Sequence, residues 1–131
     1  MPDTQDWKLE LIAVPVSDIE RAKEFYVRVG FNADHDHTVS DDVRFVQLTP
    51  PGSACSIVLD RNFTDMPSGS VKGLQCVVTD ADTAREFLLS VDVAASEVDE
   101  QPWGRFVYFA DPDGNTWALQ ELPPWSPSSS G

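Results

Sequence analysis

The chain has 131 residues, of which 41% are hydrophobic, and its nine basic and 22 acidic residues give a formal net charge of −13. This length fits one domain, or two half-size modules that share a sheet, with a substantial hydrophobic core. A strongly negative chain repels nucleic acid and anionic lipid, so we expect neither as a partner. The charge would favour a cationic ligand, although a solubilising acidic surface is the simpler explanation.

The sequence contains no apolar run near the roughly 18 residues that a membrane-spanning helix needs. Its first residues, MPDTQDWK, lack the basic and apolar regions of a signal peptide, so we expect a cytoplasmic protein. Cys55 and Cys76 fall inside expected strands. We expect both to be buried, reduced thiols rather than a disulfide or a nucleophile.

One sequence pattern occurs twice in the chain. Residues 9–26, LELIAVPVSDIERAKEFY, read as a strand, a helix cap and a helix, and residues 71–88, VKGLQCVVTDADTAREFL, repeat the pattern 62 positions later. The repeat aligns Asp18 with Asp80 and Phe25 with Phe87. An internal repeat of this kind indicates two copies of one supersecondary unit.

Each copy carries a helix signature. We expect Ser17 to cap the first helix in a capping box with Glu20, and Thr79 with Asp82 to form a weaker version of the box. Apolar residues then recur at helical spacing, which predicts two helices that pack on a sheet. These residues are Ile19, Ala22, Phe25, Tyr26 and Val29 in the first copy, and Ala81, Ala84, Phe87, Leu88 and Val91 in the second.

In chain order, the first module is expected to have strands at 7–16, 31–39, 43–49 and 54–59, with a helix that ends at Gly30 in a left-handed cap. Residues 60–70 have no periodicity, and the expected linker lies in this segment. The second module repeats the order, with strands at 73–79, 93–98, 105–110 and 116–121 and a helix that ends near residue 91. The predicted unit is therefore βαβββ, used twice.

For the domain organisation we predict a single domain at 1–122, made of module one (about 7–60), the linker (61–70) and module two (about 71–122). The tail at 123–131 is rich in Pro and Ser, and we expect it to be poorly ordered or docked only through Trp125.

Three features together carry a family resemblance: the paired modules, the motif VSDIERAKEFY followed by GF, and the final hairpin DPDGNTWALQE. From Trp7 to Leu122 the chain resembles the vicinal oxygen chelate superfamily, also called the glyoxalase/bleomycin resistance/dioxygenase superfamily. The resemblance implies an α+β fold in which two tandem modules form an incomplete barrel around a concave ligand cleft. It also implies a homodimer.

The resemblance further implies a divalent metal held by His or Glu side chains in the first and fourth strands of each module. The matching positions here are Leu11, Gly73, Ser56 and Ala118. A lone neutral hydroxyl does not hold a divalent cation, and the other side chains offer no ligand atom. We therefore predict no metal and no cofactor.

Strand alternation gives an independent check on these positions. It places Leu9, Leu11, Ala13, Ser56 and Val58 on the open face of the first module, and Gln75, Val77, Thr116, Ala118 and Gln120 on that of the second. The intervening residues are nearly all apolar and would lie beneath the helices. A shift by one residue would bury polar groups there, at a cost in stability.

Two other clusters of polar residues could offer metal ligands. His35 and His37 share one face of a strand, but two imidazoles are too few for a metal site and we expect solvated residues at a sheet edge. Asp111, Asp113 and Asn115 lack the later bidentate Glu of a calcium loop, so we expect a turn. The sequence has no nucleophile-elbow motif that would support a Ser-His-Asp triad.

The favoured function is metal-free binding of a small aromatic or cationic molecule in the concave cleft, as in the bleomycin resistance proteins. The alternative is a lyase, isomerase or dioxygenase-type enzyme that uses unusual metal ligands, or Glu97, Asp36 or Tyr108 as acid or base. A structural or regulatory dimer is the third hypothesis. No catalytic residue is assigned, and the predicted ligand-binding residues are Leu11, Phe45, Gln47, Ser56, Gln75, Trp103, Tyr108 and Ala118.

Overall fold

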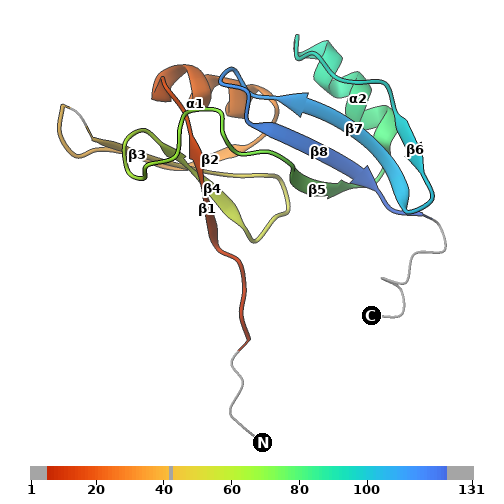
Figure 1. Ribbon diagram of the computed structural model, residues 1–131, viewed down its shortest axis with the longest axis horizontal. Coiled ribbons are helices and arrows are strands. Elements are labelled where there is room, and N and C mark those ends of the chain that lie inside the picture. Colours follow the sequence, from red (N-terminus) through yellow and green to blue (C-terminus); the bar gives the residue numbers. More distant parts are fainter. Residues whose placement is uncertain (1–5, 42, 124–131) are drawn as a thin grey trace, which may run out of the picture. The chain divides into compact units, whose positions relative to one another are not determined.

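The computed structural model describes residues 6–41 and 43–123 (Figure 1). The chain divides into two compact units, Met1–Ser68 and Gly69–Gly131, and each is described by itself. The expected docking of Trp125 lies outside the described residues. In the described part of the chain, no helix is both long enough and apolar enough to cross a bilayer.

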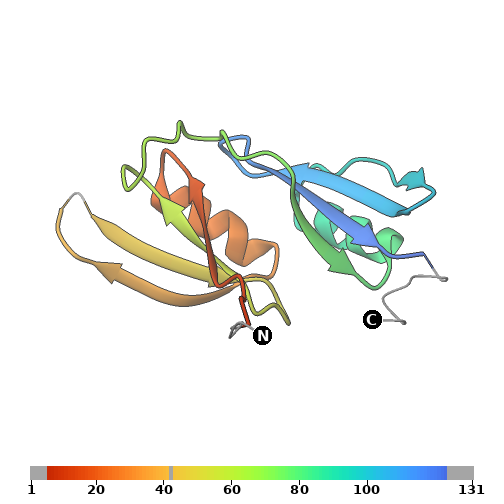
Figure 2. The ribbon, with the colours of Figure 1, turned by 60° about the horizontal axis from the view of Figure 1, so that its bottom comes forward.

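Unit 1 contains β1 (Leu11–Pro15), α1 (Ile19–Arg28), β2 (Asn32–Thr38), β3 (Arg44–Thr49) and β4 (Ser56–Asp60). Its sheet has the order β1-β4-β3-β2. β1 runs parallel to β4, and the other neighbours are antiparallel. α1 packs on the sheet, where its contacts are with β2, β3 and β4 (Figure 2).

Unit 2 contains β5 (Leu74–Val78), α2 (Ala81–Ser90), β6 (Asp99–Gln101), β7 (Gly104–Ala110) and β8 (Thr116–Glu121). The sheet order β5-β8-β7-β6 repeats that of unit 1, and β5 is again parallel to β8. α2 packs on β7 and β8. The α+β class and the two βαβββ modules predicted from the sequence are therefore confirmed.

Each core lies between a helix and one face of a sheet. In unit 1, Tyr26 of α1 and Leu48 and Leu59 of the sheet are fully buried, and in unit 2 Leu88 of α2 and Val107 of β7 are at most 2% exposed. Burying side chains of this size contributes about 1.5–3 kcal/mol each. The alternation of the strands leaves the opposite face of each sheet uncovered by its helix.

The helix caps differ from the prediction. The N-caps are Asp18 and Asp80, which have extended backbone and accept bonds from the amides of Arg21 and Thr83. Ser17, predicted to cap α1, instead accepts a bond from the Arg21 guanidinium at 3.4 Å. Aspartate and serine are about equally good caps, so their adjacency left the residue ambiguous, whereas the repeated aspartate fits both helices.

One strand was placed wrongly. Residues 93–98 are irregular, and the second strand of unit 2 in chain order is the short β6. The Val93 amide donates to Leu88 O at the end of α2, and Val93 is buried there. Ser96 makes two hydrogen bonds with the backbone of Tyr108, one through its amide and one through its hydroxyl, instead of a regular strand ladder. The apolar residues of this segment pack at the end of the helix, and composition alone does not distinguish such a segment from a strand.

A buried carboxylate lies at the end of β4. Asp60 is the last residue of β4 and is 2% exposed. Its carboxylate accepts the amide of Phe63 at 2.7 Å, the amide of Thr64 at 3.2 Å and the Thr64 hydroxyl. A buried carboxylate needs such donors, and here they fold the start of the linker back onto the strand.

We predict that Gly69→Ala destabilises unit 2 more than Gly73→Ala. Both glycines have positive φ, +77° and +81°, where a non-glycine residue costs about 1–2 kcal/mol. A Cβ at residue 69 would lie 1.9 Å from the carbonyl oxygen of Asp113, whereas one at residue 73 meets nothing within 4 Å. Urea unfolding of both variants measures the difference, and equal losses of free energy would contradict the steric argument.

Candidate functional site

The open face of the sheet in unit 2 carries the most developed candidate site. Along β5, Gln75 and Val77 are exposed, whereas Leu74 and Cys76 are partly buried on the side of α2. On the neighbouring strand β8, Ala118 pairs with Gln75. This is the alternation that the sequence predicted.

A cavity of about 560 Å³ lies on unit 2. Its wall includes three of the predicted ligand-binding residues, namely Gln75, Tyr108 and Ala118. Gly73 and Thr116 also line it, and Phe109, Ala110 and Trp117 complete the wall. Sequence reasoning missed the last three residues; continuing the alternation along β7 from Tyr108 would have placed Ala110 on the open face.

Trp103, a predicted ligand-binding residue, does not line this cavity. It sits in the turn between β6 and β7, its side chain is 59% exposed, and it is not part of the cavity wall. Its backbone carbonyl accepts a 3.1 Å bond from Gln120 Nε2, and Gln120 Oε1 accepts a 2.7 Å bond from Gln75 Nε2. Trp103 is thus connected to the wall through its main chain.

Tyr108 presents an aromatic ring and a hydroxyl group on the cavity wall. Its hydroxyl donates a 2.7 Å bond to Asp99 Oδ2, and its ring stacks on Phe106 with centroids 6.1 Å apart and an interplanar angle of 8°. The hydrogen bond to Asp99, then burial, then the charge of Asp99 raise the pKa of Tyr108. The hydroxyl is therefore protonated at neutral pH and directed at the carboxylate.

The other four predicted ligand-binding residues belong to unit 1. Leu11 pairs with Ser56 across β1 and β4, so these two lie side by side on the open face. Gln47 pairs with Val58 on one side and His35 on the other, and Phe45 pairs with His37. Pairing therefore brings each of Gln47 and Phe45 beside an exposed histidine.

The two histidines lie as predicted on one face of an edge strand. β2 is the last strand of its sheet and all seven of its residues are exposed. The rings of His35 and His37 stack with centroids 5.9 Å apart. Their solvation agrees with the expected edge position.

The residues present do not fit the metal that the resemblance implied. Leu11 and Ser56 are paired in unit 1, but in unit 2 Ala118 pairs with Gln75 rather than with Gly73. Leucine, alanine and glycine side chains offer no ligand atom, and the Ser56 hydroxyl is bonded to that of Thr49 at 2.6 Å. Within residues 6–41 and 43–123, no three His, Cys, Asp or Glu side chains form a group suited to a metal ion.

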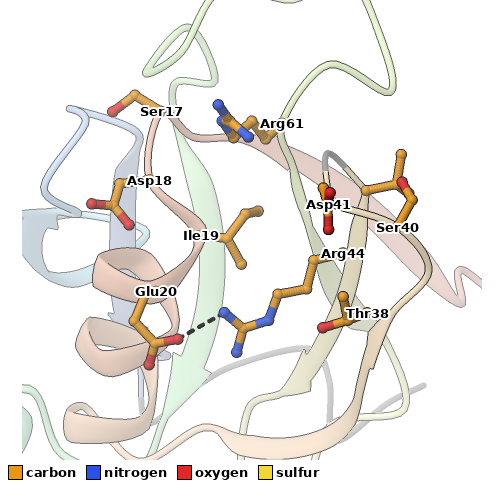
Figure 3. Close-up of a pocket in the computed structure, with 10 residues that line it drawn as sticks. Ser17, Asp18, Ile19, Glu20, Thr38, Ser40, Asp41, Arg44 and Arg61 are labelled. Atoms are coloured by element: carbon orange, nitrogen blue, oxygen red, sulfur yellow. Dashed lines mark hydrogen bonds and ion pairs between the residues drawn. The ribbon is translucent and has the colours of Figure 1, made fainter.

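A second cavity, of about 410 Å³, lies in unit 1 at the start of α1 (Figure 3). Figure 3 shows Arg44 reaching from β3 to Glu20 on α1, a contact of 2.7 Å. The wall is mostly polar, with Ser17, Asp18, Ile19, Glu20, Thr38, Ser40, Asp41, Val43, Arg44 and Arg61. The cavity of unit 2 is larger and has more apolar walls, which suit a small organic molecule better.

Arg44 also holds Asp36, one of the residues considered as an acid or base. The guanidinium makes two bonds to the Asp36 carboxylate, at 2.6 and 2.8 Å, and Lys23 Nζ makes a third at 2.6 Å. The bonds from Arg44, then that from Lys23, hold the pKa of Asp36 well below its ordinary value of 3.8. A carboxylate held ionised in this way is a poor proton acceptor near neutral pH.

Comparison with known proteins identifies the family to which this fold belongs. Residues 8–119 match the model of the Glyoxalase/Bleomycin resistance protein/Dioxygenase superfamily. The match covers most of the chain, and the chain belongs to this superfamily.

Two solved structures from Streptomyces sp. CB03234 are similar. TnmS3, an antibiotic binding protein, is 38% identical with a TM-score of 0.84 and covers 92% of this chain and 100% of its own. A glyoxalase/bleomycin resistance protein is 40% identical with a TM-score of 0.77, over 87% and 100% of the two chains. The uncharacterized protein YetH of Bacillus subtilis (strain 168) is 28% identical over 115 residues, which is 84% of this chain and 94% of YetH.

We predict that Asp36→Asn removes a pH-dependent part of the stability of unit 1. Since the folded pKa of Asp36 is lowered, its ionised form stabilises the fold above the unfolded pKa, and this contribution is lost as the pH falls. The difference in unfolding free energy between wild type and variant should be constant above about pH 5 and shrink toward about pH 2. Urea unfolding across this range measures it.

The matched control is Asp65→Asn, which removes one exposed carboxylate from the same unit. A difference that stays constant down to about pH 2 for Asp36→Asn would contradict the ion-pair argument.

Proposed function

We propose that this protein binds a small, planar, aromatic or cationic molecule without a metal ion and holds it without transforming it. The observation that carries the proposal is the cavity of about 560 Å³ on unit 2, where Gln75, Tyr108 and Ala118 meet. A concave site with apolar walls and a few directed polar groups is typical of small-molecule binding.

The wall has the shape and chemistry for a flat molecule. Tyr108 is 41% exposed, and its ring already stacks on Phe106 on the inner side, so a ligand ring can pack against its accessible surface. Ala110, Thr116 and Ala118 are small, which lets such a ring approach the sheet closely. The net charge of −13 and the Asp99 carboxylate beside Tyr108 favour a cationic ligand over an anionic one.

The similar proteins support binding. TnmS3 is described as an antibiotic binding protein, and it shares 38% of its residues with this chain. By analogy, we propose sequestration of an antibiotic-like molecule as the role of this cavity. The homodimer expected from the resemblance stays a prediction.

The enzymatic alternative has less support from the site. Tyr108 is the one candidate acid or base of the three that lines the cavity, and its raised pKa keeps it protonated. Glu97 is an exposed residue of the irregular segment before β6. Asp36 belongs to unit 1 and is tied to Arg44 and Lys23.

We predict that Ala110→Trp weakens binding of proflavine, a planar cationic acridine, roughly tenfold or more, equivalent to about 1.4 kcal/mol. Ala110 is an exposed residue of the wall, so an indole there fills the cavity without replacing core atoms. Fluorescence titration of proflavine into the protein measures the affinity.

The matched control is Leu89→Trp, which adds an indole to the exposed side of α2 in the same unit. Its affinity for proflavine should stay within about twofold of wild type. Equal affinities for wild type and Ala110→Trp would place proflavine outside this cavity and remove the support for the proposed function.

We also predict that binding does not require a metal. Proflavine affinity should be unchanged after dialysis against EDTA and in a double variant with His35→Ala and His37→Ala, because the cavity wall has no histidine, cysteine or carboxylate. Elemental analysis of the purified protein is the second measurement. Stoichiometric zinc, nickel, manganese or iron that disappears from the double variant, together with a loss of binding, would overturn metal-free binding.

A further inference from the structure

Two glutamine side chains and one main-chain carbonyl form a continuous chain of hydrogen bonds on the open face of unit 2. It begins at Gln75 in the cavity wall, passes through Gln120 and ends at the carbonyl of Trp103. The two bonds measure 2.7 and 3.1 Å, both within the normal range. The chain therefore connects the cavity to the turn between β6 and β7.

The direction of this chain is fixed by its last member. A main-chain carbonyl can only accept, so Gln120 must turn its Nε2 toward Trp103. Its Oε1 then faces Gln75, and Gln75 must in turn offer its own Nε2. The orientation of the two amides follows from hydrogen-bond chemistry, independently of how oxygen and nitrogen were assigned.

The turn also holds Gln120 in position. Gly104 follows Trp103, and a Cβ at this residue would lie 2.9 Å from Gln120 Nε2 and 3.1 Å from Gln120 Cγ. The absence of a side chain at Gly104, which is buried, lets the Gln120 amide lie against the backbone there. Rotation of this amide is therefore restricted on the side of the turn.

The fixed direction leaves Gln75 Oε1 as an open acceptor. No residue in 6–41 or 43–123 donates to this oxygen. An amide that donates through its N–H becomes a stronger acceptor at its oxygen, so the chain strengthens Oε1. Gln75 Nε2 keeps a second hydrogen, but it has already donated one hydrogen bond, and the hydrogen-bond chain does not make it a stronger donor.

We propose that Gln75 determines the specificity of the cavity and that the preferred ligand is a planar molecule with an N–H or O–H donor, bound at Gln75 Oε1. This inference rests on the proposed function of the same cavity. Gln120 and the Trp103 carbonyl are positioning groups, since they orient Gln75 without lining the cavity themselves. An otherwise similar ligand whose donors are blocked leaves Oε1 unpaired and binds more weakly.

The test compares two planar acridine cations that share a protonated ring N–H and differ in their exocyclic N–H donors. Proflavine has two exocyclic amino groups that donate, and acridine orange is the same planar cation with these groups fully methylated. The measured quantity is the ratio of their two affinities for the full-length protein. A ratio of affinities cancels changes in net charge, because both probes are cations.

Three variants change the chain of hydrogen bonds at different positions. Gln75→Met removes the acceptor and should shift the ratio against proflavine by about three- to tenfold, the effect of one net hydrogen bond. Gln120→Glu still accepts from Gln75 and should keep the wild-type ratio. Gln120→Lys only donates, so it turns Gln75 Oε1 away from the cavity and should shift the ratio as Gln75→Met does.

Failure of this inference and failure of the proposed function give different results. If Ala110→Trp weakens the binding of both acridines, and the ratio of their affinities is the same in wild type and all three variants, the proposed function stands. The role of Gln75 is then overturned. If Gln120→Glu shifts the affinity ratio as much as Gln120→Lys does, the fixed direction of the hydrogen bonds from Gln75 to Gln120 is overturned. If neither acridine binds the wild type, or Ala110→Trp weakens neither, the proposed function fails and the inference falls with it.

Discussion

Each sheet is stabilised by burying one face beneath a single helix, and strand alternation then determines what the opposite face can carry. In unit 2, Leu88 of α2 and Val107 of β7 are buried on the helix side of the layer. Residues two positions apart along a strand share a face, so these core positions fix the intervening residues on the open side. The open face of unit 2 is thereby released from core packing and can carry amides, small residues and a cavity.

Parallel pairing of the first and last strands adds a second constraint. Leu11 pairs with Ser56 in unit 1, whereas the corresponding pairing in unit 2 joins Gln75 to Ala118, two residues away from the sequence repeat. A shift of two residues keeps every side chain on its original face, so both units retain their cores. It places Gln75 instead of Gly73 beside Ala118, which brings the Gln75 amide into the cavity wall. Two copies of one repeated sequence pattern can therefore present different surfaces.

The sequence predicts the layers of this structure better than its local details. Alternation and helical spacing depend on burial, which is averaged over many residues, so the βαβββ order and the faces of Gln75 and Ala118 could be predicted. The cap at Asp18 and the irregular segment from Val93 each depend on single hydrogen bonds made by a backbone amide, for which the sequence offers two comparable partners. The chain from Gln75 to the Trp103 carbonyl needs the position of a turn and the rotamer of Gln120. Neither property leaves a pattern in the sequence.

At the positions where the resemblance implies metal ligands, Leu11, Gly73 and Ala118 offer no ligand atom and Ser56 offers only a hydroxyl, so the proposed binding draws on other interactions. Packing a ring that buries about 200 Å² of apolar surface contributes roughly 5 kcal/mol, whereas one neutral hydrogen bond contributes about 1 kcal/mol. Contact with Tyr108 and the small wall residues would then supply most of the affinity. The open Gln75 acceptor would select the ligand and its orientation, because a donor can reach it from one direction. Such a division lets a cavity hold a flat molecule tightly while discriminating by one polar atom.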